Sequence, residues 1–298
     1  MGGAALALGI IGLILGGIPV WGTIPALIFG ILAWILGGKK AKVLRASENK
    51  AGIGVAITGK VLGIIGTIQG LIMLVVFGLL LYPAISSAQT KASSNAMAMR
   101  GRSLYQAVIM ANVEREASGL GSVWPRSGDK LGDDADDIGG RNFTSATKYF
   151  ETLFDVPNNG TKDHHSYVGD LDLSVLAGDG VTKAADGARM LEGKNVGWCV
   201  LKGVTDEMDD VVPVLVSANV NVDDLVTSGD FDGRSPMMVR LGTANGAAKD
   251  MFGNKCFVVV RKSGAAEVID AKYGKLYRVY QNMPFSIPRG VTLEYLKP

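Results

Sequence analysis

Residues 61 to 96 read VLGIIGTIQGLIMLVVFGLLLYPAISSAQTKASSNA, and this stretch decides the architecture of the chain. No charged side chain occurs from Val61 to Tyr82, a length that suits one crossing of a bilayer with a hydrocarbon core of about 30 Å. After Pro83, alanines recur every three or four residues among polar side chains, which is typical of an amphipathic helix. The sequence therefore predicts a transmembrane helix over 61–83 that continues directly into a second helical segment.

Another apolar region precedes this helix, because Ala4 to Gly38 contains no charged residue. The region is too long for one straight span, and the sequence IPVWGTIP at 18–25 interrupts it with two prolines and a glycine. We predict two short spans, roughly 4–18 and 22–37, joined by a turn. A re-entrant hairpin is the alternative, because each arm is shorter than the usual minimum of about 17 residues.

The charges near the amino terminus predict the orientation in the membrane. Residues 37 to 50 read GGKKAKVLRASENK, with five basic residues and one acidic residue, and are expected to form a cytoplasmic loop. The segment 1–60 is thus predicted to be a membrane hairpin with a basic loop. Everything after Pro83 is predicted to lie outside the cytoplasm, which implies a bacterial inner-membrane location with the lipid bilayer as the first partner.

Charge also argues against a nucleic-acid partner. Residues 1 to 83 hold six of the 30 basic residues and one of the 28 acidic residues, so the remainder of the chain is mildly acidic. No strongly basic block with interleaved aromatic residues occurs there, and such a block would be expected of a nucleic-acid binder.

Two features inside the 61–83 span concern helix packing. Glycines recur on one helix face, which predicts close contact with another helix; they are Gly59, Gly63, Gly66 and Gly70. Gln69 is the one strongly polar side chain deeper in the span. Its amide is expected to need a hydrogen-bond partner within a helix bundle, and a structural bond is favoured over a transport role.

Residues 84–298 are predicted to form one exported α+β domain. A long helix over 84–117 carries a stripe expected to face a sheet and ends near Gly119, Gly121 and Pro125. The apolar residues of this helix are Ala84, Ala88, Ala92, Ala96, Met99, Leu104, Ala107, Val108 and Ala111, and those expected to face the sheet are Ala88, Ala92, Ala96, Leu104, Val108 and Ala111. A short helix is predicted from Ser145 to Phe154, and strands at 196–204, 211–216, 257–261 and 266–269. The last two strands should form a hairpin around Lys262-Ser263-Gly264.

These segments carry a resemblance to known families. The sequences LLLYPAI at 79–85, AQTKASSNA at 88–96, LYQA at 104–107 and WP at 124–125 make residues 60 to 270 similar to type II secretion pseudopilins and related pilin-like proteins. Residues 4 to 80 also resemble small glycine-rich bacterial membrane domains of unknown function. The resemblance implies a pilin-like fold, a non-catalytic role and partners among other envelope or pilin-like proteins.

The start of the transmembrane helix departs from the pilin pattern. Pilin-type subunits have a phenylalanine and a nearby glutamate after the glycine at which the leader is cleaved. Gly59-Lys60-Val61-Leu62-Gly63-Ile64 has the glycine but neither of those residues. We therefore expect the mature chain to keep residues 1–59.

Candidate binding chemistry is sparse. Asp133, Asp134, Asp136 and Asp137 offer the hard oxygens that calcium prefers, as do Asp230 and Asp232 in a second loop. The pseudopilin resemblance adds to the calcium hypothesis, because some pseudopilins hold calcium in a loop at a sheet edge. Neither loop has the spacing of an EF-hand, and solvated acidic loops are the alternative.

The cysteines and histidines complete the set of candidates. Cys199 and Cys256 lie in predicted strands, where an oxidising compartment would permit a disulfide; two separate buried thiols are the alternative. His164 and His165 are adjacent, so their side chains should diverge in a solvated loop.

No serine or cysteine lies in a recognised nucleophile motif, and we predict no enzyme activity and no cofactor. The sequence predicts a membrane-anchored structural or assembly component of a secretion or pilus-type envelope system. A membrane-anchored extracytoplasmic ligand-binding or sensing domain is the alternative.

Overall fold

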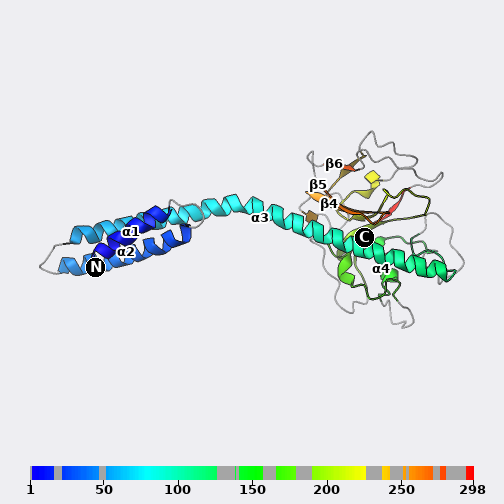
Figure 1. The fold of residues 1–298 in the computed structure, drawn as a ribbon, viewed down its shortest axis with the longest axis horizontal. Coiled ribbons are helices and arrows are strands. Elements are labelled where there is room, and N and C mark those ends of the chain that lie inside the picture. Colours follow the sequence, from blue (N-terminus) through cyan, green and yellow to red (C-terminus); the bar gives the residue numbers. More distant parts are fainter. Residues whose placement is uncertain are drawn as a thin grey trace. The chain divides into compact units, whose positions relative to one another are not determined.

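The chain forms two compact units in the computed structural model, Met1–Ala88 and Gln89–Pro298 (Figure 1). Helix α3 (Ile53–Ala117) contributes residues to both. The structure describes residues 2–16, 22–46, 52–125, 138, 141–156, 166–178, 190–225, 237–241, 251–252, 255–270, 276–279 and 293–298.

The first unit contains α1 (Gly2–Gly16), α2 (Thr23–Ala46) and the beginning of α3. Glycines bring α1 and α3 together: a Cβ atom at Gly59 would lie 2.7 Å from the carbonyl carbon of Ala5, and one at Gly9 would lie 2.9 Å from Cβ of Leu62. The order of these contacts shows that α1 runs parallel to α3. Side chains larger than hydrogen at these positions would push the helices apart.

Glycines also form the contact between α2 and α3. A Cβ at Gly63 would lie 2.6 Å from the backbone nitrogen of Trp34, and one at Gly70 would lie 2.9 Å from Cγ of Leu27. The helices are antiparallel, because α2 residues of falling number meet α3 residues of rising number. The predicted packing role of the four α3 glycines is confirmed: Gly59 meets α1, Gly63 and Gly70 meet α2, and Gly66 lies within 4 Å of both.

The surface of this unit is apolar. Large aliphatic residues are exposed from Ile10 to Ile85, and Leu79 reaches 72% exposure. By length and composition, two described helical segments could span a bilayer, Ile24–Ala46 and Ile53–Ala117, while the apolar helix Gly3–Leu15 is shorter. This unit therefore has the surface composition expected of a membrane segment, with hydrocarbon-like side chains outside as well as inside.

The structure corrects the predicted basic loop at 37–50. Helix α2 continues to Ala46, so that Lys39, Lys40, Lys42 and Arg45 lie in its last turns. Lysine, alanine, leucine and arginine are all good helix formers, and nothing in KKAKVLRA interrupts the helix. Residues 47–50 lie outside the described residues. A Cβ at Gly37 would lie 2.8 Å from the Lys60 nitrogen, so the basic residues and Lys60 share one end of the unit.

Helix α3 confirms the predicted continuity, because the apolar span and the amphipathic segment form one helix of 65 residues with Pro83 inside it. It begins at Ile53, ahead of the expected start at Val61. Helix α3 ends at Ala117, just before the glycines that were predicted to end it. Gly119 has φ +72°, and the next amide, that of Leu120, donates to the Arg115 carbonyl at 2.8 Å.

The second unit is built on an antiparallel sheet of five strands in the order β5-β4-β2-β1-β7. The strands are β1 (Trp198–Leu201), β2 (Pro213–Ser217), β4 (Cys256–Arg261), β5 (Ala266–Asp270) and β7 (Tyr295–Leu296). Strands β1, β2, β4 and β5 match the predicted apolar runs, and the predicted β4–β5 hairpin is confirmed by the pairing of Val260 with Ala266. The fold class α+β is therefore correct.

Among the described residues, three strands were not predicted. Besides β7, the structure contains a two-stranded sheet of β3 (Met237–Arg240) and β6 (Leu276–Val279). The 3₁₀ helix η4 (Val222–Leu225) is tied to β3 by Asp224, whose carboxylate accepts from the Arg240 guanidinium at 2.7 and 2.9 Å. Two further 3₁₀ helices are η2 (Leu173–Leu176) and η3 (Gly193–Asn195).

The short predicted helix is confirmed as α4 (Ala146–Leu153), with Ser145 as its N-cap. The Ser145 side chain accepts a hydrogen bond from the Lys148 amide at 3.3 Å. The amide of Ala146 donates to the Lys297 carbonyl at 2.7 Å, which ties the start of α4 to the chain just after β7.

The structure confirms the burial of Leu104, Val108 and Ala111 in the predicted stripe of α3 and corrects the amino-terminal part of that stripe. The buried stripe is Met97, Gly101, Leu104, Val108 and Ala111. The expected contacts at Ala88, Ala92 and Ala96 are exposed. The row 88-92-96 lies one residue, about 100°, away from the buried row. The row that contains Gly101 faces the sheet because a glycine at this position lets the helix approach the sheet closely. A Cβ at Gly101 would lie 2.5 Å from Cη2 of Trp198 and 2.8 Å from Cγ2 of Val260.

Candidate functional site

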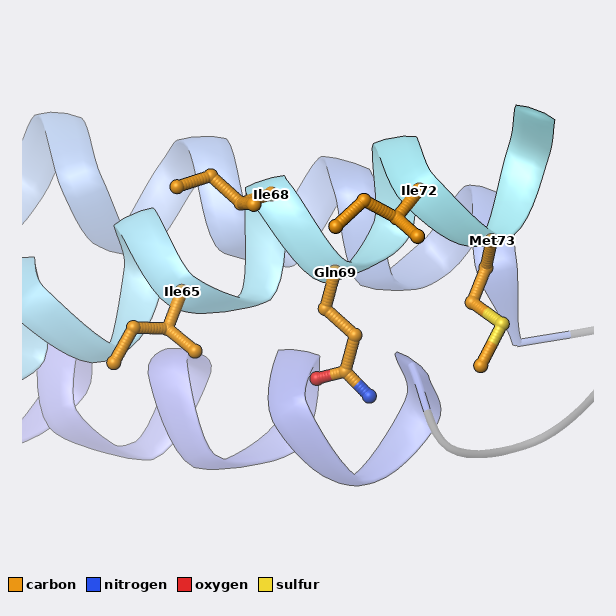
Figure 2. A pocket seen from close by; sticks show the side chains of 5 residues that line it. All are labelled: Ile65, Ile68, Gln69, Ile72 and Met73. Atoms are coloured by element: carbon orange, nitrogen blue, oxygen red, sulfur yellow. The ribbon is translucent and has the colours of Figure 1, made fainter. Parts of the chain in front are cut away.

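Two hollows in the described residues are candidates for function, one in each unit. The first is a shallow groove of about 270 Å³ along α3 (Figure 2), lined by Ile65, Ile68, Gln69, Ile72 and Met73. These positions follow helical spacing, so a single face of one helix builds the groove. Only one of its side chains is polar.

Gln69 provides that polar group, and Figure 2 shows its amide pointing toward α1. Within the described chain, the amide makes no hydrogen bond. The residues of α1 offer no polar side chain, since they read GGAALALGIIGLILG. The nearby Thr67 hydroxyl, in contrast, donates to the Gly63 carbonyl in the preceding turn at 2.7 Å. The open surface of the groove is therefore almost entirely apolar, with the Gln69 amide directed toward α1 and away from the open side.

The second hollow is a cleft of about 260 Å³ in the α+β unit. Four chain segments form it: one face of α3, the residues after α3, the loop after β1, and the β4–β5 turn. Tyr105 and Trp124 provide aromatic surface, with ring centroids 6.1 Å apart. Glu116 and Asp206 bring two carboxylates to the lining.

Hydrogen bonds within the cleft fix its polar groups. Asn112 accepts from the Val123 amide at 3.1 Å through Oδ1 and donates through Nδ2 to the Glu116 carboxylate at 2.7 Å. Lys262 directs its ammonium to the carbonyls of Asp206, at 2.7 Å, and Met208. The described lining thus holds aromatic rings, an amide, an ammonium group and carboxylates around one hollow, an arrangement that can recognise a small polar group.

Tyr105 links the helix to the sheet at this cleft. Its hydroxyl donates to the Lys262 carbonyl, and its ring is almost fully buried. Burial raises the pKa of Tyr105, and the negative charge of Asp210 raises it further. The phenol therefore stays protonated at neutral pH and serves as a hydrogen-bond donor.

The two cysteines are buried thiols that form no disulfide in the structure. Cys199 lies in β1 and Cys256 in β4, with β2 between them. Strands next to each other are about 4.8 Å apart, so two strand spacings exceed the roughly 7 Å limit for a disulfide between Cα atoms. Of the two alternatives, the structure has the two separate thiols. Burial raises the pKa of Cys199 to about 12; Lys297 lowers it and Asp223 raises it to smaller extents.

All of the acidic and histidine candidates fall outside the described residues. They are Asp133, Asp134, Asp136, Asp137, Asp230, Asp232, His164 and His165, and the calcium hypothesis stays a prediction. Among the described residues, no three or more His, Cys, Asp or Glu side chains gather in a way that would hold a metal ion.

Sequence reasoning identified Gln69 but missed the cleft. The cleft residues come from separate segments, and no sequence motif joins Asn112 to Trp124 or Lys262. Comparison with protein-family models, with curated proteins and with solved structures found no match to this chain. The functional argument therefore depends on the residues and their placement.

Proposed function

We propose that this chain is a membrane-anchored, non-catalytic protein of the bacterial inner membrane. In this proposal its α+β unit is a pilin-like domain outside the cytoplasm, and it serves as a structural or assembly component of a secretion or pilus-type envelope system. The proposal begins from one observation: a single helix, α3, contributes an apolar, exposed span to one unit and a sheet-packing stripe to the other.

The exposed apolar surface supports the membrane part of the proposal. The side chains of Leu74, Val75 and Leu79 on α3 are 48%, 54% and 72% exposed. Exposure of so much contiguous apolar surface would make a water-soluble protein aggregate, whereas hydrocarbon solvates it. The cations at the end of α2 and Lys60 would remain on the cytoplasmic side, which directs the carboxyl-terminal unit outward.

The packing of Gly59 supports retention of the amino-terminal hairpin. This residue lies inside α3 and against Ala5 and Leu6 of α1. Cleavage at Gly59 would require the protease to open a packed helix. Retention of residues 1–59 would hold the domain permanently in the membrane, in contrast to filament subunits that leave the bilayer.

The outer surface of α3 supports a role in protein contacts. In the α+β unit, Met99, Met110 and Val113 expose large apolar side chains on the helix away from the sheet. Met99 and Met110 are 11 residues apart, close to three helical turns, and therefore lie on one face. Methionine and valine on an exposed helix face suit contact with another helix.

Site-specific photocrosslinking in native membranes tests this proposal. A photoreactive residue at Met110 is expected to yield discrete adducts with identified secretion or pilus components. The same residue at Glu207, an exposed loop position, is the control and should yield far fewer. If Met110 captures no envelope component under conditions in which the protein is membrane-bound, the assembly role is wrong.

The cleft favours a second candidate, the membrane-anchored ligand-binding or sensing domain. Its aromatic wall at Trp124 and fixed carboxylate at Glu116 suit a small amine or other polar solute. Titration of the detergent-purified chain with small amines and sugars, followed by tryptophan fluorescence, tests this candidate. A saturable change that the Glu116→Gln variant weakens would favour it over the assembly role, and an unchanged signal throughout would exclude these solute classes.

A further inference from the structure

We propose that the basic end of the first unit binds the phosphate groups of anionic phospholipids in the cytoplasmic leaflet. This basic end consists of the cations in the last turns of α2 and one cation of α3 at the same end of the unit, namely Lys39, Lys40, Lys42, Arg45 and Lys60. The inference rests on the proposed membrane location and orientation, and it extends them by naming the class of lipid that this surface selects.

The described part of the first unit contains no acidic residue to neutralise these cations. Glu48 is the one acidic residue in the sequence of this unit, and it lies outside the described residues. Lys39, Lys42 and Arg45 are exposed. Ala41, in the same turns, is only 7% exposed and continues the buried row of α2. The exposed side of this helix end therefore carries concentrated positive charge, which attracts the anionic lipids of the cytoplasmic leaflet.

The position of the cations along α2 matches the depth of lipid headgroups. Helix α2 has no charged residue from Thr23 to Gly38, a length of about 22 Å at roughly 1.5 Å per residue. The segment from Lys39 to Arg45 covers about 9 Å more along the helix axis. This length is close to the thickness of one headgroup layer, about 5–8 Å. When the apolar part of α2 lies in hydrocarbon, the cations therefore span the headgroup layer.

A column of exposed apolar side chains leads along α2 to these cations. Leu32, Ile35 and Leu36 are exposed by 42%, 47% and 43%. They precede Lys39 by seven, four and three residues, so they lie on the same side of the helix as this lysine. A phospholipid fits this arrangement along its length, because its acyl chain would lie against the apolar column while its phosphate lies beside Lys39.

The combination of charge and apolar surface selects a lipid over other anions. Inorganic phosphate has the charge but no apolar part, so it gains nothing from the apolar column. Nucleic-acid binders of single strands add aromatic side chains on which bases stack, and residues 39–45 contain none. Lys39 and Lys42 are three residues apart and thus neighbours on the helix surface. Each ammonium group has three N–H donors, so the pair can share the oxygens of one lipid phosphate.

Native mass spectrometry of the full-length chain in detergent, titrated with dioleoyl phosphatidylglycerol or dioleoyl phosphatidylcholine, tests the inference. The parent should bind phosphatidylglycerol more tightly. Lys39→Gln combined with Lys42→Gln should weaken that binding on the order of 25-fold, about five-fold for each charge, and leave phosphatidylcholine binding unchanged. Lys39→Arg with Lys42→Arg keeps the charge and should match the parent. Lys91→Gln with Arg102→Gln removes two exposed charges from the α+β unit and should match it too.

Equal affinity of the parent for the two lipids would overturn the inference, as would a double glutamine variant that still prefers phosphatidylglycerol. Displacement of the lipid by an equal concentration of inorganic phosphate or of a short RNA would also overturn it, because the surface would then bind a free anion or a nucleic acid. Alkaline extraction of cell membranes separates this result from the proposed function. Release of the parent chain into the soluble fraction would overturn both, whereas a membrane-retained chain without lipid preference would overturn only the lipid inference.

Discussion

Gly101 is the point at which α3 comes closest to the sheet, and Gly101→Ala should destabilise the α+β unit. The added methyl group would lie 2.5 Å from the Trp198 ring and 2.8 Å from Val260. Both neighbours are completely buried, so neither can swing aside into solvent. The helix would have to shift away from the sheet and lose contacts along its buried stripe.

The size of the effect follows from two opposing contributions. Overpacking a filled core costs about 1–3 kcal/mol. Alanine is a better helix former than glycine by about 1 kcal/mol. Since both contacting groups belong to the rigid centre of the sheet, the cost should be near its upper end. The free energy of unfolding should therefore fall by about 1–2 kcal/mol, or the melting temperature by about 2–8 °C for a unit of this size.

The assay is guanidinium unfolding of the full chain in detergent, followed by near-ultraviolet circular dichroism. Gly78→Ala is the matched control, because Gly78 lies on the same helix and an added Cβ would meet nothing within 4 Å. This control should unfold at the parent midpoint or slightly above it. A Gly101→Ala variant that is as stable as the parent would refute the close packing of α3 on β1 and β4.

Three further predictions concern the same unit. Leu104→Asp should abolish cooperative unfolding because Leu104 is fully buried, whereas Lys91→Asp on the exposed surface should change stability by no more than about 0.5 kcal/mol in the same denaturation assay. Cys199 and Cys256 should resist iodoacetamide at pH 8 in the folded chain and both react in guanidinium without a reductant; reaction only after reduction would indicate a disulfide. The hydrogen bond from the Arg240 side chain lowers the pKa of Asp224 below its ordinary value of 3.8. The ionised carboxylate therefore stabilises the fold at pH values above 3.8, and this stabilisation is lost as the pH falls through the lower pKa of the folded state. Asp224→Asn should thus reduce the urea midpoint at pH 7 and have a smaller effect at pH 2, and an equal effect at both would contradict the ion pair.

Local signals predicted the elements that depend on nearby residues. The uncharged run from Val61 and the following alanines gave one continuous helix, and Ser145 marked the start of α4. The short turn at Lys262-Ser263-Gly264 predicted the β4–β5 hairpin. In these cases the residues that determine the structure are neighbours in sequence.

Predictions failed where contacts between residues far apart in the sequence determine the structure. Alanines at 88, 92 and 96 have the spacing of a buried stripe, but alanine is small enough to be exposed or buried without great cost. The contact of α3 with the sheet requires that Gly101 has no side chain. The pattern of apolar residues in the sequence does not reveal this requirement. Strand β7 contains only Tyr295 and Leu296, too few residues for a period to show.

The candidate sites were likewise predictable only where their residues are close together in the sequence. Gln69 was recognisable in the sequence as a lone amide in an apolar span, and the structure adds that this amide points toward α1 (Figure 2). The separation of Cys199 from Cys256 depends on strand order, which places β2 between them. The cleft beside Tyr105 required four segments to meet, and no single segment suggests it.

The central claim is that α3 leads the chain out of the cytoplasm, and a pair of reporters fused after Pro298 tests it most directly. Alkaline phosphatase, active only outside the cytoplasm, should be strongly active in intact cells. A fluorescent protein that folds only in the cytoplasm, fused at the same position, should be dark although the fusion is present at full length. The opposite result, a bright cytoplasmic reporter and a silent phosphatase, would contradict the proposed orientation and with it the exported pilin-like domain.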